Sequence, residues 1–293
     1  MNMIDMPADV SGASDAQLRK WELQIARKHS GMFPWMMVLW GFGNLLFWLA
    51  LWPLVIFDIL PLWAGFILAT ISVSLVYLPT HDAQHDIIAR PGQKLRWLNE
   101  LLGHATTWII VLPFNVLRVT HLQHHRHTND PDRDPDIASQ APGPWSAIWR
   151  GVLERQPNGK SGPNYFATLE RVGRPDLQLL AVAYQLGHLA ILFTLAWSGF
   201  ALEAFFLWWL PKQLAMIHQN FFLSWAPHSP DMPMGRYKNT RSWKSAVGNI
   251  ISMGMQYHSV HHLHPYIPLD RTPAAFREMR PLLEARGVDL GKL

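Results

Sequence analysis

The sequence contains no cysteine and few charged residues. Without cysteine, disulfides, thiolate zinc sites and cysteine-ligated iron–sulfur clusters are excluded, so any metal must be bound by nitrogen and oxygen ligands. Charged residues make up 16% of the 293 residues and hydrophobic residues 49%, whereas soluble domains carry about 25% charged residues. This balance is typical of a membrane protein. The net charge of +4 is small and favours a membrane surface over nucleic acid as the partner.

Two long segments, 33–57 and 60–80, contain no charged residue at all. A transmembrane helix needs roughly 20 apolar residues, so both segments are predicted to cross the membrane, as a hairpin that turns at Asp58–Pro61. A second hairpin is predicted over 177–197 and 200–222. Its last helix is interrupted by Pro211 and by Lys212, whose role stays open.

The basic residues are distributed on one side of this scheme. Of 25 Lys and Arg residues, 24 lie in the amino-terminal segment, in 90–174 or in 236–292, and Lys212 is the remaining one. Basic residues mark cytoplasmic loops, so the two hairpin turns are expected outside and the termini in the cytoplasm. The apolar segment 105–114 is too short to cross, and we expect it to dip into the interface.

These patterns predict an all-α integral membrane protein. It has four transmembrane helices in two hairpins and a cytoplasmic helical cap, with 32–293 as the membrane domain. Residues 1–31 are predicted to form a surface helix or tail. Ser14 and Gln17 form a capping-box pattern that predicts a helix start, with the helix ending near His29, which we expect to be solvated.

The histidines form three clusters with helical spacing. Residues three and four apart share one face of a helix, so each cluster can point its imidazoles at one place. A lone HxxxH can be two surface histidines, but HxxHH occurring twice in one chain favours a metal site. The clusters are "HDAQH" (His81, His85), "HLQHH" (His121, His124, His125) and "HSVHH" (His258, His261, His262).

Eight imidazoles exceed the three or four ligands that one metal ion needs, so two metals are the natural count. Imidazole suits iron, copper, zinc and nickel, and the spacing does not choose among them. His228 can complete the ligand set from the end of the fourth predicted span, and His218 is the alternative. We expect His127 and His264 to lie off the site, and His104 and His188 to be structural.

Aspartates accompany two of the clusters. Metal-bound imidazoles commonly give their second N–H to a carboxylate, which makes acids near the clusters candidates for that role. The Asp-Pro repeats that follow the second cluster are equally typical of turns. The candidate partners are Asp82, Asp86, Asp130 and Asp134.

The three clusters on this scaffold resemble the histidine boxes of the membrane fatty acid desaturase/hydroxylase superfamily. "RVTHLQHHRHTNDPDRDPD" and "QYHSVHHLHPYIP" are similar, more narrowly, to the β-carotene hydroxylase branch. The resemblance implies two non-haem iron ions on the box histidines, with O2 as co-substrate and a further ligand from the end of the fourth helix, which fits His228. An extra ligand position of some acyl desaturases falls on Ser224, a departure from that pattern.

The resemblance implies a membrane-bound oxidoreductase in a bacterial inner membrane, with its boxes in the cytoplasm. It would hydroxylate or desaturate an unactivated C–H bond of an apolar lipid. β-Carotene ring hydroxylation, a step of carotenoid biosynthesis, is the leading hypothesis, and acyl-lipid desaturation is the alternative. A non-catalytic membrane metal-binding protein ranks lower. An external ferredoxin or cytochrome must supply electrons, and Arg236, Lys238, Arg241 and Lys244 are candidates to dock it.

Overall fold

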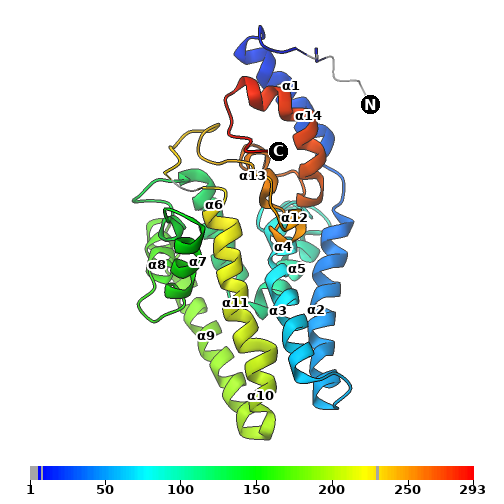
Figure 1. The fold of residues 1–293 in the computed structure, drawn as a ribbon, viewed down its shortest axis with the longest axis vertical. Coiled ribbons are helices and arrows are strands. Elements are labelled where there is room, and N and C mark those ends of the chain that lie inside the picture. The colour runs from blue at the N-terminus through cyan, green and yellow to red at the C-terminus, as the bar shows by residue number, and fades with distance from the viewer. Residues whose placement is uncertain (1–5, 8, 229–230) are drawn as a thin grey trace.

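The computed structural model describes residues 6–7, 9–228 and 231–293, and over these residues the chain is helical with no strand (Figure 1). Of the predicted amino-terminal segment 1–31, residues 1–5 and 8 lie outside the described part. The longer elements are α1 (Asp15–His29), α2 (Trp35–Ile56), α3 (Leu62–Leu75), α4 (Tyr77–Gln84), α5 (Arg96–Ile109), α6 (Phe114–His127), α7 (Pro144–Leu153), α8 (Ser161–Arg171), α9 (Asp176–Leu195), α11 (Leu210–Gln219) and α14 (Thr272–Ala285). The short helices are α10 (Ala201–Ala204), α12 (Gly248–Ile251) and α13 (His258–Leu263).

Three helical runs are long and apolar enough to cross a membrane, namely Trp35–Ile56, Leu62–Gln84 and Asp176–Trp197. They correspond to three of the four predicted spans. Helices α2 and α3 lie side by side, joined by a turn in which Asp58 has a left-handed φ of 57° (Figure 1). The run Leu62–Gln84 continues through α3 into α4, so the first histidine cluster is part of the same rod as the second span.

The fourth predicted span is not one regular helix. Between Ala201 and Trp225 the chain passes through α10, α11 and two π-helical segments, Phe205–Trp209 and Asn220–Trp225. π-Helical turns are rare and interrupt the regular ladder. The chain reaches this run through Gly199, whose φ of 94° reverses its direction after α9. A fourth crossing therefore remains a prediction, although the hairpin turn lies where the sequence places it.

The short apolar segment 105–114 contains a sharp bend. Helices α5 and α6 meet at 98° around residues 110–113, and the pair can be a broken span or a re-entrant loop. The bend is buried, with Val111 in the left-handed region at a φ of 59°, and the indole of Trp208 donates a hydrogen bond to the Ile109 carbonyl at 2.7 Å. The bend turns α6 back toward α4, which brings the second histidine cluster beside the first.

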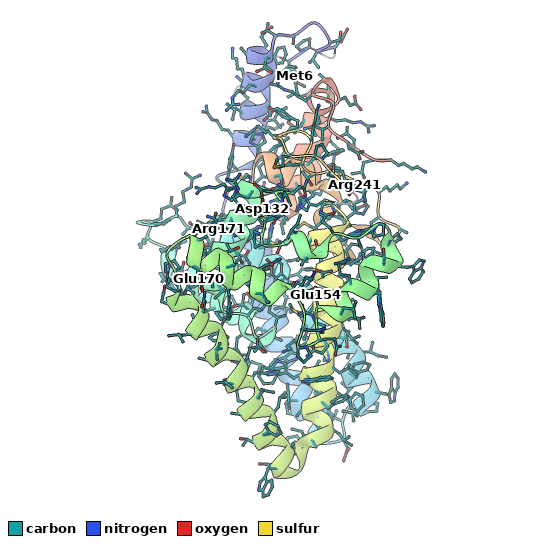
Figure 2. All side chains as sticks on the ribbon, turned by 90° about the vertical axis from the view of Figure 1, so that its left-hand side faces the viewer. Met6, Asp132, Glu154, Glu170, Arg171 and Arg241 are labelled. Atoms are coloured by element: carbon teal, nitrogen blue, oxygen red, sulfur yellow. The ribbon has the colours of Figure 1, made fainter. Side chains whose placement is uncertain are left out.

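Charged side chains concentrate in the half of the molecule opposite the α9–α10 turn. Asp132, Arg171 and Arg241 all lie in that half (Figure 2). In the apolar half, Trp48 packs against Trp108 and Trp208, and its indole donates to the Leu207 carbonyl at 2.9 Å. These contacts pack α2 against the π-helical segment Phe205–Trp209 in the apolar half of the molecule.

The amino-terminal helix α1 packs on the carboxy-terminal helix α14 (Figure 1). The predicted capping box is present, because Ser14 and Gln17 bond reciprocally. Buried Glu22 accepts hydrogen bonds from His264 at 2.9 Å and from Tyr237 at 3.0 Å, and pairs with Arg236 at 3.3 Å. The expectation that His29 is solvated is wrong, since its ring is buried and lies 3.1 Å from Glu278. Helix α1 is thus joined to the segment that carries the third histidine cluster.

Glu22 makes the docking of α1 dependent on pH. Burial alone would raise the pKa of Glu22, but the bonds from His264, Tyr237 and Arg236 outweigh burial and lower it. A carboxyl whose folded-state pKa is lowered stabilises the fold above its unfolded pKa of about 4.3 and loses that stabilisation as pH falls further. We therefore expect α1 to be docked at pH 7 and to loosen below about pH 4.

The substitution Glu22→Ala should loosen α1 at pH 7 as well. It leaves buried donors without an acceptor, which should lower the free energy of undocking α1 by about 2 kcal/mol. Amide exchange in α1 should then become roughly 30-fold faster. Hydrogen exchange measured by mass spectrometry checks this. The matched control is Glu284→Ala on α14, which removes only an exposed pair with Arg280. Equal exchange of α1 in the two variants would contradict the role of Glu22.

Candidate metal centre

The three histidine clusters come from separate elements and meet at one end of the helical bundle. Helix α4 carries His81 and ends at His85, α6 carries the second cluster, and α13 carries the third. Local helical spacing places each cluster on one face, as expected from the sequence. The bend before α6 and the return of the chain after α12 then direct the three faces at one another.

The imidazoles divide into two groups, within each of which the ligand atoms lie within 4.8 Å of one another. The division does not follow the clusters, because α6 and α13 contribute to both groups. The first group comprises His81, His85, His121, His125 and His261, and the second comprises His124, His228, His258 and His262. Together these are the nine histidines that the sequence analysis proposes as ligands.

The ring nitrogens face each other at distances that suit a shared cation. Within the first group Nε2 of His121 lies 2.9 Å from Nε2 of His85, and Nε2 of His125 lies 2.9 Å from Nε2 of His261. Within the second group Nε2 of His228 lies 3.2 Å from Nε2 of His124 and 3.1 Å from Nε2 of His258. Two nitrogens that bind one metal ion at about 2.1 Å and at right angles are about 3.0 Å apart. The residues therefore fit a metal ion in each group.

Several ring nitrogens also lack any partner. Both nitrogens of His81 and Nε2 of His262 are buried without a hydrogen bond within the described residues. A buried polar atom without a partner costs about 1–3 kcal/mol, and metal coordination would satisfy these atoms. The expected pair of metal sites thus has an independent physical reason besides the spacing of the histidines.

His228, rather than His218, joins the second group. His228 follows the π-helical segment Asn220–Trp225, and its Nδ1 lies 3.0 Å from the Asn239 carbonyl, which orients the ring. His218 is outside both groups, with its ring packed on Phe222. The geometry therefore favours His228 over the alternative ligand His218.

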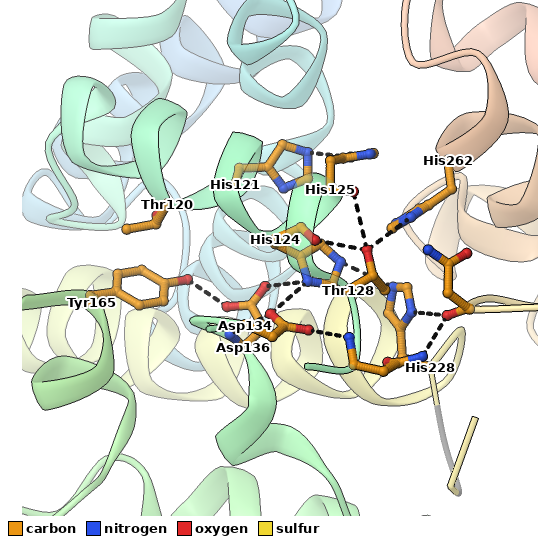
Figure 3. Close-up of polar contacts among 12 residues, drawn as sticks. Thr120, His121, His124, His125, Thr128, Asp134, Asp136, Tyr165, His228 and His262 are labelled. Atoms are coloured by element: carbon orange, nitrogen blue, oxygen red, sulfur yellow. Dashed lines mark hydrogen bonds and ion pairs between the residues drawn. The ribbon is translucent and has the colours of Figure 1, made fainter. Parts of the chain in front are cut away.

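Asp134 holds one ligand of the second group in place. Its Oδ1 accepts a hydrogen bond from Nδ1 of His124 at 2.9 Å, and Asp136 Oδ2 lies 3.9 Å from the same nitrogen (Figure 3). The backbone N–H groups of Asn129 and Asp136 also donate to Asp134 and fix its carboxylate. An imidazole held in this way presents Nε2 to the metal position.

The pKa of His124 is shifted in the opposite direction to that of His228. Burial alone would lower the pKa of His124, but the carboxylates of Asp134 and Asp136 raise it to about 9. Burial, reinforced by the charge on His124, lowers the pKa of His228 to about 3. His228 is therefore a neutral donor at neutral pH, while a metal ion would have to displace a proton from His124.

The other three aspartates proposed to bond the clusters do not contact them. Asp82 accepts from the backbone N–H of Leu269, Asp86 pairs with Arg96 at 2.5 Å, and Asp130 caps its own turn and pairs with Arg133. Adjacent residues on a helix are rotated by about 100°, so Asp82 projects from a different face than His81. Asp130 instead accepts hydrogen bonds from backbone N–H groups of its own turn, as the Asp-Pro repeats also allowed.

The remaining histidines lie outside both groups, as expected. His264 bonds Glu22 and the hydroxyl of Tyr266, and the ring of His188 packs on Trp208. The sequence reasoning missed Tyr165, whose hydroxyl donates to Asp136 at 3.0 Å (Figure 3). No spacing pattern links residues 29 positions apart, so only the fold could reveal this contact.

Two cavities reach the histidines from different sides. One, of about 280 Å³, is lined by His81, His121, His124 and His258 together with side chains of α6, α8 and α11. The other, of about 380 Å³, is lined by His125 and His262 and bordered by Arg126, Arg133 and Arg236. The two histidine groups are therefore reached by one cavity among the helices and by another that is lined by basic side chains.

Comparisons with known proteins agree with this geometry. The family described as fatty acid desaturase matches residues 57–292. A beta-carotene ketolase from Paracoccus sp. is 29% identical over 215 residues, covering 71% of this chain and 75% of that protein. An sn-1 acyl-lipid omega-3 desaturase (ferredoxin) from Nostoc sp. is 25% identical over 214 residues, covering 64% and 55%. An sn-1 oleoyl-lipid 12-desaturase from Picosynechococcus sp. is 29% identical over 101 residues, covering 32% and 27%.

The contact between Asp134 and His124 predicts a defined effect on metal binding. Asp134→Asn removes the carboxylate that fixes His124, and loss of such a partner lowers metal affinity about 10- to 100-fold. Metal content after competition with a chelator, measured by elemental analysis, checks this. Asp132→Asn is the control, because Asp132 is exposed in the same turn and its side chain contacts no histidine. Equal metal retention in the two variants would rule out this role of Asp134.

Proposed function

The chain belongs to the fatty acid desaturase family and is an oxidoreductase, and from this we propose that it uses O2 to oxidise an unactivated C–H bond of a membrane lipid. The observation that carries the proposal is the pair of buried imidazole groups beside a cavity of about 280 Å³. Because the family is enzymatic, the alternative of a non-catalytic metal-binding protein is set aside.

We propose iron as the metal in both groups. Nine imidazoles without a thiolate suit iron, copper, zinc and nickel. O2 chemistry needs redox-active metal ions, and among these the family resemblance favours iron. Two bound iron ions would supply the activation of O2, which no side chain of the protein can perform. His81, His85, His121, His125 and His261 would hold one ion, and His124, His228, His258 and His262 the other.

The protein itself supplies position, protons and exclusion of water. Asp134 orients His124, and Asp136 with the Tyr165 hydroxyl forms a hydrogen-bonded pair that faces the cavity. Hydroxylation inserts one oxygen atom of O2 into the C–H bond and reduces the other to water with two electrons and two protons. Desaturation removes two hydrogen atoms from neighbouring carbons, and the same electrons and protons complete the reduction of O2 to two water molecules.

A carotenoid ring is the leading substrate. The relative from Paracoccus sp. that matches 71% of this chain is named a beta-carotene ketolase. The sequences of the second and third histidine boxes also resemble those of the β-carotene hydroxylase branch. A ketone results from two successive hydroxylations of one carbon followed by loss of water, so hydroxylation and ketone formation begin with the same step. Acyl-lipid desaturation is the second candidate, favoured by the relatives named acyl-lipid desaturases.

Expression in a β-carotene-producing bacterium separates these candidates. We expect hydroxylated or ring-ketone carotenoids to appear under air and not under anaerobic conditions. His228→Ala should abolish them, because it removes a ligand of the second group, whereas His104→Ala should not, because His104 lies outside both groups. Chromatography of pigments and gas chromatography of fatty acids form the readout. New double bonds in fatty acids, with unchanged carotenoids, would overturn the carotenoid hypothesis.

We also propose that an external electron donor docks over the second cavity. Its walls include one histidine of each metal group, His125 and His262, and its border carries Arg126, Arg133 and Arg236. This arrangement gives an acidic ferredoxin or cytochrome the shortest approach to both groups. Of the four residues first proposed for docking, only Arg236 borders the cavity, and Arg241 is engaged with the Ala226 carbonyl.

Reversal of charge at this surface should slow electron delivery. Arg126→Glu is expected to reduce turnover with a limiting concentration of reduced ferredoxin by about 10-fold and to weaken the dependence of the rate on salt. Lys20→Glu, an exposed change on α1 away from the cavity, should have no effect. The same rate for both variants at low ionic strength would refute the docking site. Turnover with a small chemical reductant serves as the internal check that the metal centre is intact.

A further inference from the structure

The cavity beside the histidines has a polar wall that the oxidation of a hydrocarbon does not use. Arg155 follows α7 and Asn220 begins the π-helical segment, and both line this cavity. Nε of Arg155 and Nδ2 of Asn220 are shielded from solvent and have no hydrogen-bond partner within the described residues. Glu154, the neighbour of Arg155, lies at the level of α7 and α8 (Figure 2).

The acidic groups around Arg155 are already engaged. Glu154 Oε2 accepts hydrogen bonds from the backbone N–H and the hydroxyl of Ser161, both at 2.7 Å, and Asp136 accepts from Tyr165. A guanidinium remains charged in a protein. The Glu154 carboxylate offsets part of this charge, but no group bonds Nε of Arg155 within the described residues. Lys212 lies buried close enough to Arg155 for their charges to interact, and it adds to the positive potential.

The two free groups define the chemistry of their ligand. Both are N–H donors, so they can be satisfied only by acceptor atoms. A hydrocarbon in this cavity would leave both shielded N–H donors without a partner, which is unfavourable. A hydroxyl, ketone, ester or carboxylate oxygen can accept from such donors, and hydrogen bonds to charged groups are the stronger class.

This wall is near the reacting position. Asp136 Oδ2 lies 3.9 Å from Nδ1 of His124, Tyr165 bonds Asp136 at 3.0 Å, and Tyr165 lines the same cavity as Arg155. His124 of the second group, Asp136, Tyr165 and Arg155 therefore line one and the same cavity. An oxygen atom held by Arg155 would therefore belong to the same end of the substrate as the carbon that is oxidised.

We propose that Arg155 and Asn220 form a subsite for an oxygen acceptor on the substrate, so that the enzyme prefers an oxygen-bearing lipid to a pure hydrocarbon. Two sources share this chemistry: a carotenoid ring that already carries a hydroxyl or keto group, and an acyl chain with its carboxyl oxygens. The inference rests on the proposed function, since it assigns the substrate class of the same site. For a carotenoid substrate, it places this enzyme after a reaction that introduces the first oxygen atom.

A direct binding experiment tests the subsite without turnover. The full-length, metal-loaded protein in detergent is incubated without reductant with two matched pairs of ligands: β-carotene with its ring-hydroxylated derivative, and a C18 hydrocarbon with the C18 fatty acid. Bound ligands are quantified by mass spectrometry. We expect the wild type to favour the oxygenated member of one pair by about 10- to 100-fold. The preferred pair identifies which source of oxygen the site accepts.

The variants assign the preference to the wall. Arg155→Met keeps the volume of the side chain and should bring the preference close to one, Arg155→Lys should retain part of it, and Asn220→Leu should reduce it. Lys160→Met removes an exposed cation from the same loop and should leave it unchanged. Equal binding of both members of each pair by the wild type would overturn the proposal. So would an undiminished preference in Arg155→Met.

The outcome for the subsite can be told apart from the outcome for the reaction. If the oxygenated lipid binds through Arg155 but no O2-dependent product forms when reductant is added, the proposed function fails and the subsite stands. If product forms equally from the hydrocarbon and the oxygenated lipid, the function stands and the subsite fails. Unchanged metal content in Arg155→Met excludes an indirect effect through the metal centre.

Discussion

Nine imidazole rings share a buried volume in which they cannot satisfy one another, and the rest of the structure is organised around that conflict. Nitrogens 2.9–3.2 Å apart need a donor between each pair, yet burial and like charges disfavour protonation of the rings, as the pKa of His228 shows. His124 is the exception, because Asp134 compensates its charge. Cations between the rings would resolve the conflict, and this would account for the convergence of imidazoles in a protein that otherwise buries few charges.

Three features of the backbone bring the rings together. The rod formed by α3 and α4 carries the first cluster out of the apolar half, the 98° bend returns α6 to it, and the interrupted run 201–225 ends where His228 reaches the second group. The clamp between α1 and α14 then holds the segment after α13, with Glu22 bonded to His264 two positions beyond His262. Each feature acts at a distance from the rings it positions.

The cavities extend the same arrangement outward. On one side, Asp136, Tyr165 and Arg155 line the cavity in which we propose that the substrate binds, and on the other, arginines line the cavity that reaches His125 and His262. The sequence predicted the clusters because HxxxH and HxxHH place side chains on one helical face, a local property. It favoured His228 but kept His218 as the alternative, and it named Asp134 only as one of four candidate aspartates, because these choices depend on where a helix ends and which way a turn faces. The expectation for His29 failed for a related reason, since its ring contacts Glu278 on α14, which lies 249 residues away in the sequence.

The sequence by itself predicted the helical class, three apolar spans that the structure contains and the three histidine clusters, because composition and helical periodicity act over a few residues. It also named His228 as the ninth ligand, with His218 as the alternative. Only the tertiary structure decided how those histidines divide into two groups, which carboxylate orients His124 and which polar side chains face the substrate cavity. These properties arise from contacts between segments separated by 10 to 136 positions, such as His124 with Asp134 and His125 with His261. Bends, π-helical turns and docking of the termini set such contacts, and no local pattern encodes them.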